Sequence, residues 1–237
     1  MSWLSGTLTA FDLETTGTDV ESDRIVAAAV VRLEADGSLP EERTWLLDPG
    51  VAIPEEASAI HGISTERARE HGLPAAPAIE EIAGAVAEGL RSGTPLVVMN
   101  ARYDLSLLDR ECRRYGIASV SERLGADPSP VIDPLVLDKH VDKYRRGKRT
   151  LNALCTHYGV PLDDAHDARA DAVAAARVVR RMGEKHQPIG ATSLEDLHSL
   201  QVHAAAEQSL SLQAYLRRTA DPAAVVEPAW PLIPYRG

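Results

Sequence analysis

Short apolar runs alternate with turn residues in the first part of the chain, which is the pattern of strands joined by tight connections. This pattern predicts strands at 6–14, 24–33 and 43–47, with a turn at Asp36-Gly37. Strands joined by such short turns run antiparallel to one another. We therefore expect a three-stranded antiparallel meander.

From residue 53 onward, the apolar positions follow helical spacing, interrupted by short apolar runs at 96–99 and 131–133 that have the composition of buried strands. The expected helices cover 53–61, 64–70, 77–90, 104–116, 150–158 and 168–182, and another begins at Pro134. Meander strands followed by alternating helices and strands predict an α/β fold. Its sheet would be mixed and five-stranded, with helices on both faces.

The composition of the chain changes after residue 182. Residues 183–190 contain a proline and predict a linker, and Ser193 is a suitable cap for the apolar helix that follows. The tail after residue 220 carries four prolines, which favours an extended strap. We expect one domain over 1–183, with a helical and proline-rich extension over 184–237 packed on it.

Charge and cysteine content limit the class of protein. The net charge of −10 argues against a protein that coats nucleic acid by electrostatics alone, but it suits an enzyme that grips a strand end through metal ions. Cys112 and Cys155 lack metal-ligand spacing and are typical of buried free thiols. Residues 1–10 do not resemble a signal peptide, and the longest apolar run, 25–31, is too short to span a membrane. We expect a soluble cytoplasmic protein.

Two acids share one face at the end of the first predicted strand. Side chains at i and i+2 of a strand project to the same side, so Asp12 and Glu14 lie together and Leu13 points away. Paired carboxylates repel each other unless a cation lies between them, and hard divalent cations prefer carboxylate oxygen. An isolated D-x-E pair is more often a solvated strand edge, so the metal interpretation depends on matching acids downstream.

Three further residues downstream are candidates to act together with this pair. Asp104 follows a buried strand and starts a helix, where the helix dipole alone would favour an acid. His166 lies in an acidic loop ahead of the helix that carries Asp171. Histidine can exchange protons near neutral pH, which suits acid–base catalysis. In isolation, a solvated loop histidine is the favoured interpretation of His166.

The order of these residues resembles the three motifs of the DnaQ-like 3′–5′ exonuclease family, the DEDDh branch of the RNase H-like fold. The matching segments are FDLETTG at 11–17, NARYD at 100–104 and HDARADA at 166–172. HGIS at 61–64 is similar to a family segment between the first two motifs. The resemblance covers about 6–183, and the first motif is most similar to the members that resemble the epsilon subunit of DNA polymerase III.

The resemblance implies two-metal phosphodiester hydrolysis with Mg²⁺ or Mn²⁺, in which the ions stabilise both the attacking and the leaving oxygen. By position, the implied metal ligands are Asp12, Glu14, Asp104 and Asp171. His166 would be the general base that takes a proton from the attacking water. The implied substrate contacts are Leu13, Thr15, Thr16, His61 and Asn100. A turn, a core position or a strand-end cap explains these last residues equally well.

A basic segment stands out in this acidic chain. Residues 139–149 carry six lysines and arginines against one acid, Asp142, a local net charge of 6 − 1 = +5. Arg145 and Arg146 are candidate phosphate contacts. A solvated helix end is the alternative interpretation of the segment.

The expected activity is removal of nucleoside monophosphates from the 3′ end of DNA, with single strands as the expected substrate. One alternative is trimming of RNA, since the contacts that read a 2′-hydroxyl cannot be identified from the sequence. Another is a non-catalytic nucleic-acid-binding module, although no motif residue is missing. A third is a proofreading subunit that joins polymerase subunits or a sliding clamp, for which the segment QSLSL at 208–212 is a faint signal.

Overall fold

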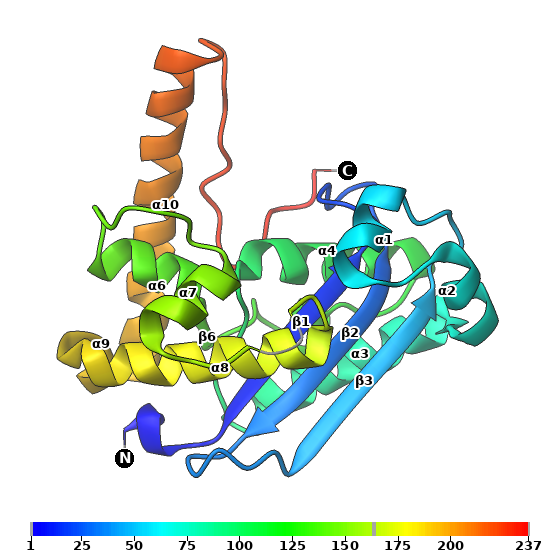
Figure 1. Cartoon of the computed structure of the whole chain (residues 1–237), viewed down its shortest axis with the longest axis horizontal. Coiled ribbons are helices and arrows are strands. Elements are labelled where there is room, and N and C mark those ends of the chain that lie inside the picture. Colours follow the sequence, from blue (N-terminus) through cyan, green and yellow to red (C-terminus); the bar gives the residue numbers. More distant parts are fainter. Residues whose placement is uncertain (1, 163–164, 237) are drawn as a thin grey trace.

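The computed structural model describes residues 2–162 and 165–236, which form a mixed sheet with helices on both faces (Figure 1). The strands lie in the order β4-β3-β2-β1-β5-β6. They span Leu8–Thr15 (β1), Ile25–Leu33 (β2), Glu41–Asp48 (β3), Leu73–Pro74 (β4), Leu96–Val97 (β5) and Val131–Ile132 (β6). Strands β1, β2 and β3 pair antiparallel and confirm the predicted meander, whereas β5 runs parallel to β1 and to β6.

Helices occupy most of the chain between and after these strands. A 3₁₀ helix, η1, covers Trp3–Ser5, and the first α-helices are Glu55–His61 (α1), Thr65–His71 (α2), Ala75–Arg91 (α3), Ala101–Tyr115 (α4) and Val120–Leu124 (α5). The later ones are Pro134–Val141 (α6), Leu151–Tyr158 (α7), Ala168–Lys185 (α8), Gln187–Ala191 (α9) and Leu194–Thr219 (α10). Ser64 and Ser193 cap α2 and α10 as predicted, each accepting a backbone N–H bond from the first turn.

The central strand β1 separates two hydrophobic cores. Phe11 and Leu13 face the core built with α3 and α4, whereas Leu8 and Ala10 face the core built with α8. Figure 1 shows α8 in front of the sheet and α3 behind it. Because side chains alternate along a strand, the acids at positions 12 and 14 share the face of Leu8 and Ala10. The pattern of β1 thus directs its carboxylates toward the start of α8.

The sheet has one strand more than the sequence predicts. The additional strand, β4, is only two residues long and pairs parallel with the end of β3. A two-residue strand that contains a proline has no alternating pattern, so only its position beside β3 reveals it. The short helix α5 was also not predicted, because its five residues are too few for a helical period.

The predicted linker at 183–190 is wrong, because this stretch is largely helical. Helix α8 continues to Lys185, and Pro188 lies at the start of α9, where a proline is tolerated. A Cβ atom at Gly183 would meet the Leu4 side chain at 2.5 Å. This glycine therefore serves close packing of α8 against η1 and does not end the helix.

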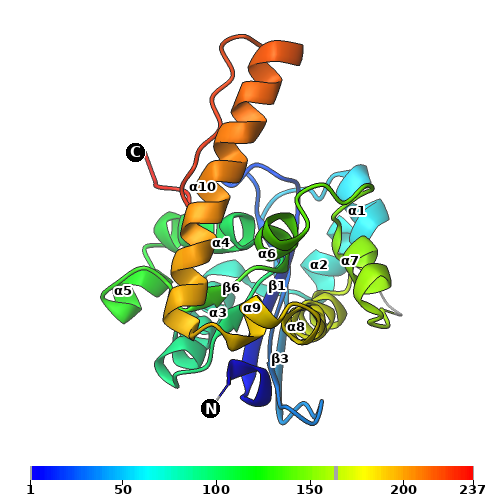
Figure 2. The same cartoon turned by 90° about the vertical axis from the view of Figure 1, so that its left-hand side faces the viewer.

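The C-terminal segment extends away from the body of the molecule and then folds back onto it. Helix α10 begins against α6 and β6, and its second half stands away from the rest of the molecule (Figures 1 and 2). Residues 220–236 contain no helix or strand and run back along α10 to bury Trp230. Within the described ranges, no helix combines the length and apolar character that a membrane crossing requires.

The turn before β4 leads to a prediction about stability. A Cβ atom at Gly72 would lie 2.3 Å from the carbonyl oxygen of Ala68 and 2.4 Å from the backbone nitrogen of Asp48, and neither backbone atom yields easily. We expect Gly72→Ala to lower the free energy of unfolding by about 1–3 kcal/mol, measured by urea denaturation. Gly84→Ala is the control, since nothing lies within 4 Å of that position in α3. It should raise stability by up to about 1 kcal/mol. Equal effects of the two substitutions would contradict this account.

Candidate active site

The first two acids lie near the end of β1. Asp12 is half-buried and Glu14 is buried, and their partners across the antiparallel ladder are Ala29 and Ala27 of β2. Residues paired in this way share a face of the sheet. Both partners are alanines, so no bulky side chain of β2 stands beside the carboxylates at these positions.

A hydrogen-bonded turn follows the acids and fixes the end of the strand. The Thr15 hydroxyl donates to the Gly17 carbonyl at 2.7 Å, and the Thr16 hydroxyl donates to Asp23 Oδ1 at 2.7 Å. A Cβ atom at Gly17 would overlap the Asp23 carboxylate, which explains the glycine. Both threonines therefore build the turn itself.

The third acid, Asp104, lies in the first turn of α4 and is only 4% exposed. The chain enters this helix through Asn100, which has a left-handed backbone with φ 63° and ψ 47°. One position before the acid, the Tyr103 hydroxyl lies 2.9 Å from Thr15 Oγ1. This contact ties the start of α4 directly to the turn after β1.

The last two residues lie where α8 begins. Asp167 caps the helix by accepting the Ala170 N–H bond at 3.0 Å. The backbone N–H of His166, a residue with φ 70°, donates to Asp171 Oδ2 at 3.2 Å. Ligand atoms of Glu14, His166 and Asp171 all lie within 4.8 Å of one another. The structure thus brings the first and third sequence motifs together, while Asp163 and Asp164 lie outside the described residues.

Burial and mutual repulsion make these acids reluctant to ionise together. The pKa of Asp12 is raised well above its ordinary value, first by burial and then by the charges of Asp104 and Asp171. Burial, followed by the charges of Asp171 and Asp167, raises the pKa of Glu14 to about 8. Burial likewise raises the pKa of Asp104 and of Asp171. A cluster of this kind is stabilised by added positive charge.

The same residues fit a divalent-cation site. Asp171 Oδ1 is buried and has no hydrogen-bond partner among the described residues, although its other oxygen accepts from His166. Carboxylate oxygens are the ligands that Mg²⁺ and Mn²⁺ prefer. An unpaired buried oxygen beside other carboxylates therefore suits a cation far better than it suits an apolar interior.

Of the predicted substrate residues, His61 lies beside the third motif. His61 is half-buried at the end of α1, and its pKa is lowered by burial and by the charge of His166, against an opposing contact with the Thr15 backbone. Its Nε2 atom is buried and finds no hydrogen-bond partner within the part of the chain that the structure describes. Asn100 is exposed at the start of α4. Leu13, by contrast, is buried in the core between β1 and α4.

The two predicted phosphate contacts differ in their surroundings. Arg145 donates to Asp138 Oδ2 at 2.7 Å, and Arg149 pairs with the same oxygen. Asp138 is fully buried and also accepts from the Tyr158 hydroxyl at 3.0 Å. Arg145 is therefore engaged inside the domain, whereas Arg146 is exposed.

Sequence reasoning overlooked Asp133, Tyr103 and Asp167. Asp133 is buried and accepts backbone N–H bonds from Asn100 and Ala101 at the start of α4. Asp133 stands directly before Pro134, a position that suits a helix cap, but the sequence does not indicate its contact with the start of α4. Tyr103 stood inside the second motif, and Asp167 inside the third, so the motifs themselves were the only signal.

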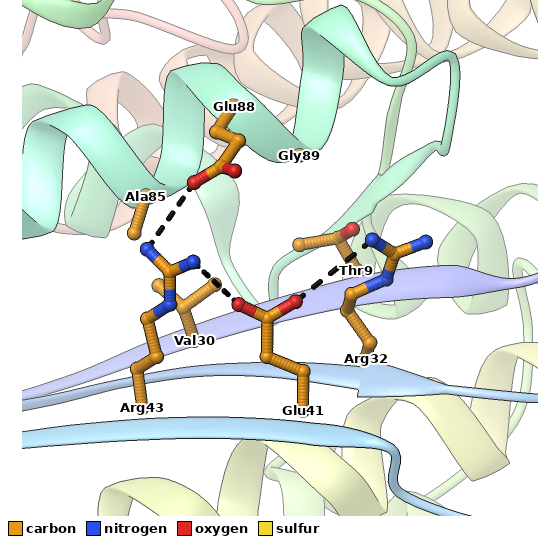
Figure 3. Close-up of a pocket in the computed structure, with 8 residues that line it drawn as sticks. All are labelled: Thr9, Val30, Arg32, Glu41, Arg43, Ala85, Glu88 and Gly89. Carbon is orange, nitrogen blue, oxygen red and sulfur yellow. Dashed lines mark ion pairs between the residues drawn. The ribbon is translucent and has the colours of Figure 1, made fainter.

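A small cavity between α3 and the sheet is separate from this site (Figure 3). Figure 3 shows Arg43 between Glu41 and Glu88, and Arg32 beside Glu41, so the charges are mutually balanced. Thr9 lines the cavity and points to the face of β1 opposite to the acids. The cavity therefore takes no part in the acidic cluster.

The family model for Exonuclease (RNase_T) matches residues 9–179, which include all five motif residues. The chain belongs to this exonuclease family. The match confirms the resemblance to DnaQ-like 3′–5′ exonucleases that the three motifs indicated.

Relatives of this exonuclease chain include much longer polymerases. It is 27% identical over 197 residues to a PolC-type DNA polymerase III of Caldanaerobacter subterraneus subsp. tengcongensis, and 30% identical over 200 residues to that of Thermotoga petrophila. These matches cover 83% and 84% of the chain but only 13% of either relative. The chain thus corresponds to a small part of the polymerases it matches.

Solved structures of exonuclease I share the fold. The enzyme of Methylocaldum szegediense superposes with a TM-score of 0.62 at 25% identity, over 89% of this chain and 46% of that one. E. coli exonuclease I in complex with a dT13 oligonucleotide gives 0.65 at 22% identity, over 77% and 42%. The exonuclease fold therefore accounts for less than half of either neighbour.

The raised pKa of Glu14 leads to a prediction about pH. A carboxyl whose pKa rises on folding, here from 4.5 to about 8, holds its proton more tightly in the folded state. The folded state therefore loses stability as pH rises through that window. In EDTA, we expect Glu14→Gln to remove part of this loss, on the order of a few kcal/mol. Urea unfolding of both proteins at about pH 5 and about pH 8 measures it.

The control for this experiment is Glu207→Gln, which changes an exposed acid on α10. It should unfold with the same pH dependence as the parent protein. Added Mn²⁺ should restore the stability of the parent protein at the higher pH. If Glu14→Gln and Glu207→Gln unfold with the same pH dependence, the Glu14 carboxyl does not cause the loss of stability at higher pH.

Proposed function

We propose that this protein is a metal-dependent 3′–5′ exonuclease that removes nucleoside monophosphates from the 3′ end of DNA. The observation that carries the proposal is the convergence of four carboxylates and a histidine from three distant motifs at the end of β1. Membership of the exonuclease family supports it. A non-catalytic module would have no reason to keep such mutually repelling acids together.

In this proposal, Asp12, Glu14, Asp104 and Asp171 hold two divalent cations, Mg²⁺ or Mn²⁺. Bound cations would neutralise the charge that develops on the scissile phosphate and on the attacking and leaving oxygens. His166 is the general base, because it is exposed beside Glu14 and Asp171 and can pass a proton to solvent.

The proposed substrate is DNA, with single strands preferred. The E. coli exonuclease I neighbour was solved with a dT13 oligonucleotide, and the PolC-type relatives are DNA polymerases. His61, which lies near Thr15 and His166, is a proposed contact to the terminal nucleotide, together with Thr15 and the exposed Asn100. Leu13 and Thr16 are less suitable, because Leu13 is buried in the core and the Thr16 hydroxyl donates to Asp23. RNA is the alternative substrate, because a nearby 2′-hydroxyl needs only one additional polar contact.

Polymerase subunits are the proposed partners, on the ground that the PolC-type relatives are polymerases. Another neighbour is a complex of exonuclease I with the C-terminus of SSB, which adds single-strand-binding protein as a partner to test. The clamp-like segment at 208–212 is less suitable, because it is helical and Gln208 donates to the Val136 carbonyl at 3.0 Å. The buried free thiols Cys112 and Cys155 suit the cytoplasm.

The decisive experiment is degradation of 5′-labelled single-stranded DNA, duplex DNA and RNA with Mg²⁺, Mn²⁺ or EDTA. We expect a metal-dependent ladder that shortens from the 3′ end, fastest on single-stranded DNA. Asp12→Ala should reduce the rate by several orders of magnitude while the protein stays folded. Full activity of a folded Asp12→Ala variant would overturn the assignment. Faster cleavage of RNA would change the substrate and not the reaction.

The basic segment between α6 and α7 gives a separate prediction. Arg146 is exposed, so Arg146→Ala should lower the salt dependence of single-strand binding by roughly 0.7 in the log–log slope, with unchanged stability. Arg145→Ala is the matched comparison. It should destabilise the fold by about 1–3 kcal/mol, because buried Asp138 loses a partner. Fluorescence anisotropy at several salt concentrations measures the slope. An unchanged slope for Arg146→Ala would exclude it as a phosphate contact.

A further inference from the structure

Asp133 is a buried acid that lies behind the catalytic cluster. Its Oδ1 atom accepts N–H bonds from Asn100 at 3.1 Å and Leu135 at 2.9 Å. Its Oδ2 atom accepts from Ala101 at 3.0 Å and from Trp230 Nε1 at 3.3 Å. One carboxylate therefore joins the starts of α4 and α6 to the C-terminal tail.

A second residue of the C-terminal segment, Gln201, binds the backbone of Asp133. Gln201 on α10 is fully buried, and its Oε1 atom accepts the Asp133 backbone N–H at 2.7 Å. Its Nε2 atom donates to the Val131 carbonyl at 2.9 Å. Both the side chain and the backbone of Asp133 are thus held by residues far along the chain. Such buried polar contacts are expensive to break once they are formed.

The tail also lies along the outer side of α4. Three residues of that helix, spaced four apart and so on one side of it, hold the tail. Arg102 donates to the Glu227 carbonyl at 2.6 Å, and Arg110 donates to the Ile233 carbonyl at 3.0 Å. Ser106 Oγ accepts the Ile233 N–H at 2.8 Å. Asp104 projects to the roughly opposite side of the helix, toward the acids of β1.

The start of α4 is where this arrangement matters. Asp104 lies in the first turn of α4, so the backbone of Asn100 and Ala101 decides where its carboxylate stands relative to the acids of β1. The bonds from Asn100 and Ala101 to Asp133 restrain that backbone. A metal site needs its ligands held in place before the cation arrives.

We propose that Gln201 and Trp230 are positioning residues that hold Asp104 in place through Asp133. The inference rests on the proposed function, since it assigns to the C-terminal segment a part in forming the metal site. Trp230 fixes the Asp133 carboxylate, Gln201 fixes its backbone, and the carboxylate fixes the first residues of α4. Neither residue touches the substrate or the reacting atoms.

The first test compares two tryptophan substitutions that each remove one indole N–H bond to a carboxylate. Trp230→Phe removes the bond to Asp133, and Trp45→Phe removes a 2.9 Å bond to Glu81 on the other side of the molecule. Hydrogen exchange is measured at the amides of Asn100 and Ala101 in the full chain. We expect exchange about tenfold faster in Trp230→Phe and unchanged in Trp45→Phe. Equal exchange in the two variants would overturn the proposal.

The second test separates positioning from simple stabilisation. Mn²⁺ affinity, measured by calorimetry without substrate, should fall several-fold in Trp230→Phe and stay constant in Trp45→Phe. The kcat for single-stranded DNA should fall similarly, while the KM for DNA stays constant. If both variants lose equal stability and neither loses Mn²⁺ affinity, the tail is only a structural support and the proposal is wrong.

Gln201→Leu provides an independent variant, because it affects the Asp133 backbone instead of the carboxylate. It should reproduce the faster exchange at Ala101 and the weaker Mn²⁺ binding. The exchange experiment does not depend on activity. A protein that binds no Mn²⁺ and cleaves no strand would refute the proposed function, while the exchange comparison would still decide whether the C-terminal segment holds the start of α4.

Discussion

Repulsion among carboxylates at the end of β1 is the constraint on which the rest of the structure depends. Asp12, Glu14, Asp104 and Asp171 are at least half-buried, and their pKa values rise because burial and neighbouring charge both oppose ionisation. A fold tolerates such a cluster only if the surrounding structure holds it together. In the proposed function, a divalent cation among these acids would convert each repulsive contact into shared coordination.

The scaffold counteracts this repulsion in two ways. Asp104 and Asp171 both lie in the first turn of a helix, where the N-terminal end of the dipole favours negative charge. The other two acids lie on the central strand, whose partners on both sides prevent it from moving. Rigid elements therefore present all four acids, and only the histidine lies on a loop.

The C-terminal segment adds a third support that the family match does not include. The match ends at residue 179, whereas Gln201 and Trp230 belong to the chain after it. These two residues meet at Asp133, directly behind the helix that carries Asp104. In this proposal, a segment outside the matched region influences the acidic cluster without contacting it.

The sequence by itself determined the meander, most helices and the five motif residues, because these depend on local patterns: alternation in β1, helical spacing, and short motifs of acids. It could not reveal β4 or the helical nature of 183–190, where two residues or one glycine depend on distant neighbours for their conformation. It also could not distinguish Arg145 from Arg146, since only the buried Asp138 separates them. Asp133 and Trp230 lie 97 residues apart, and only tertiary packing brings them together. Side-chain contacts between distant segments leave no periodic trace in the sequence, so tertiary structure alone decided them.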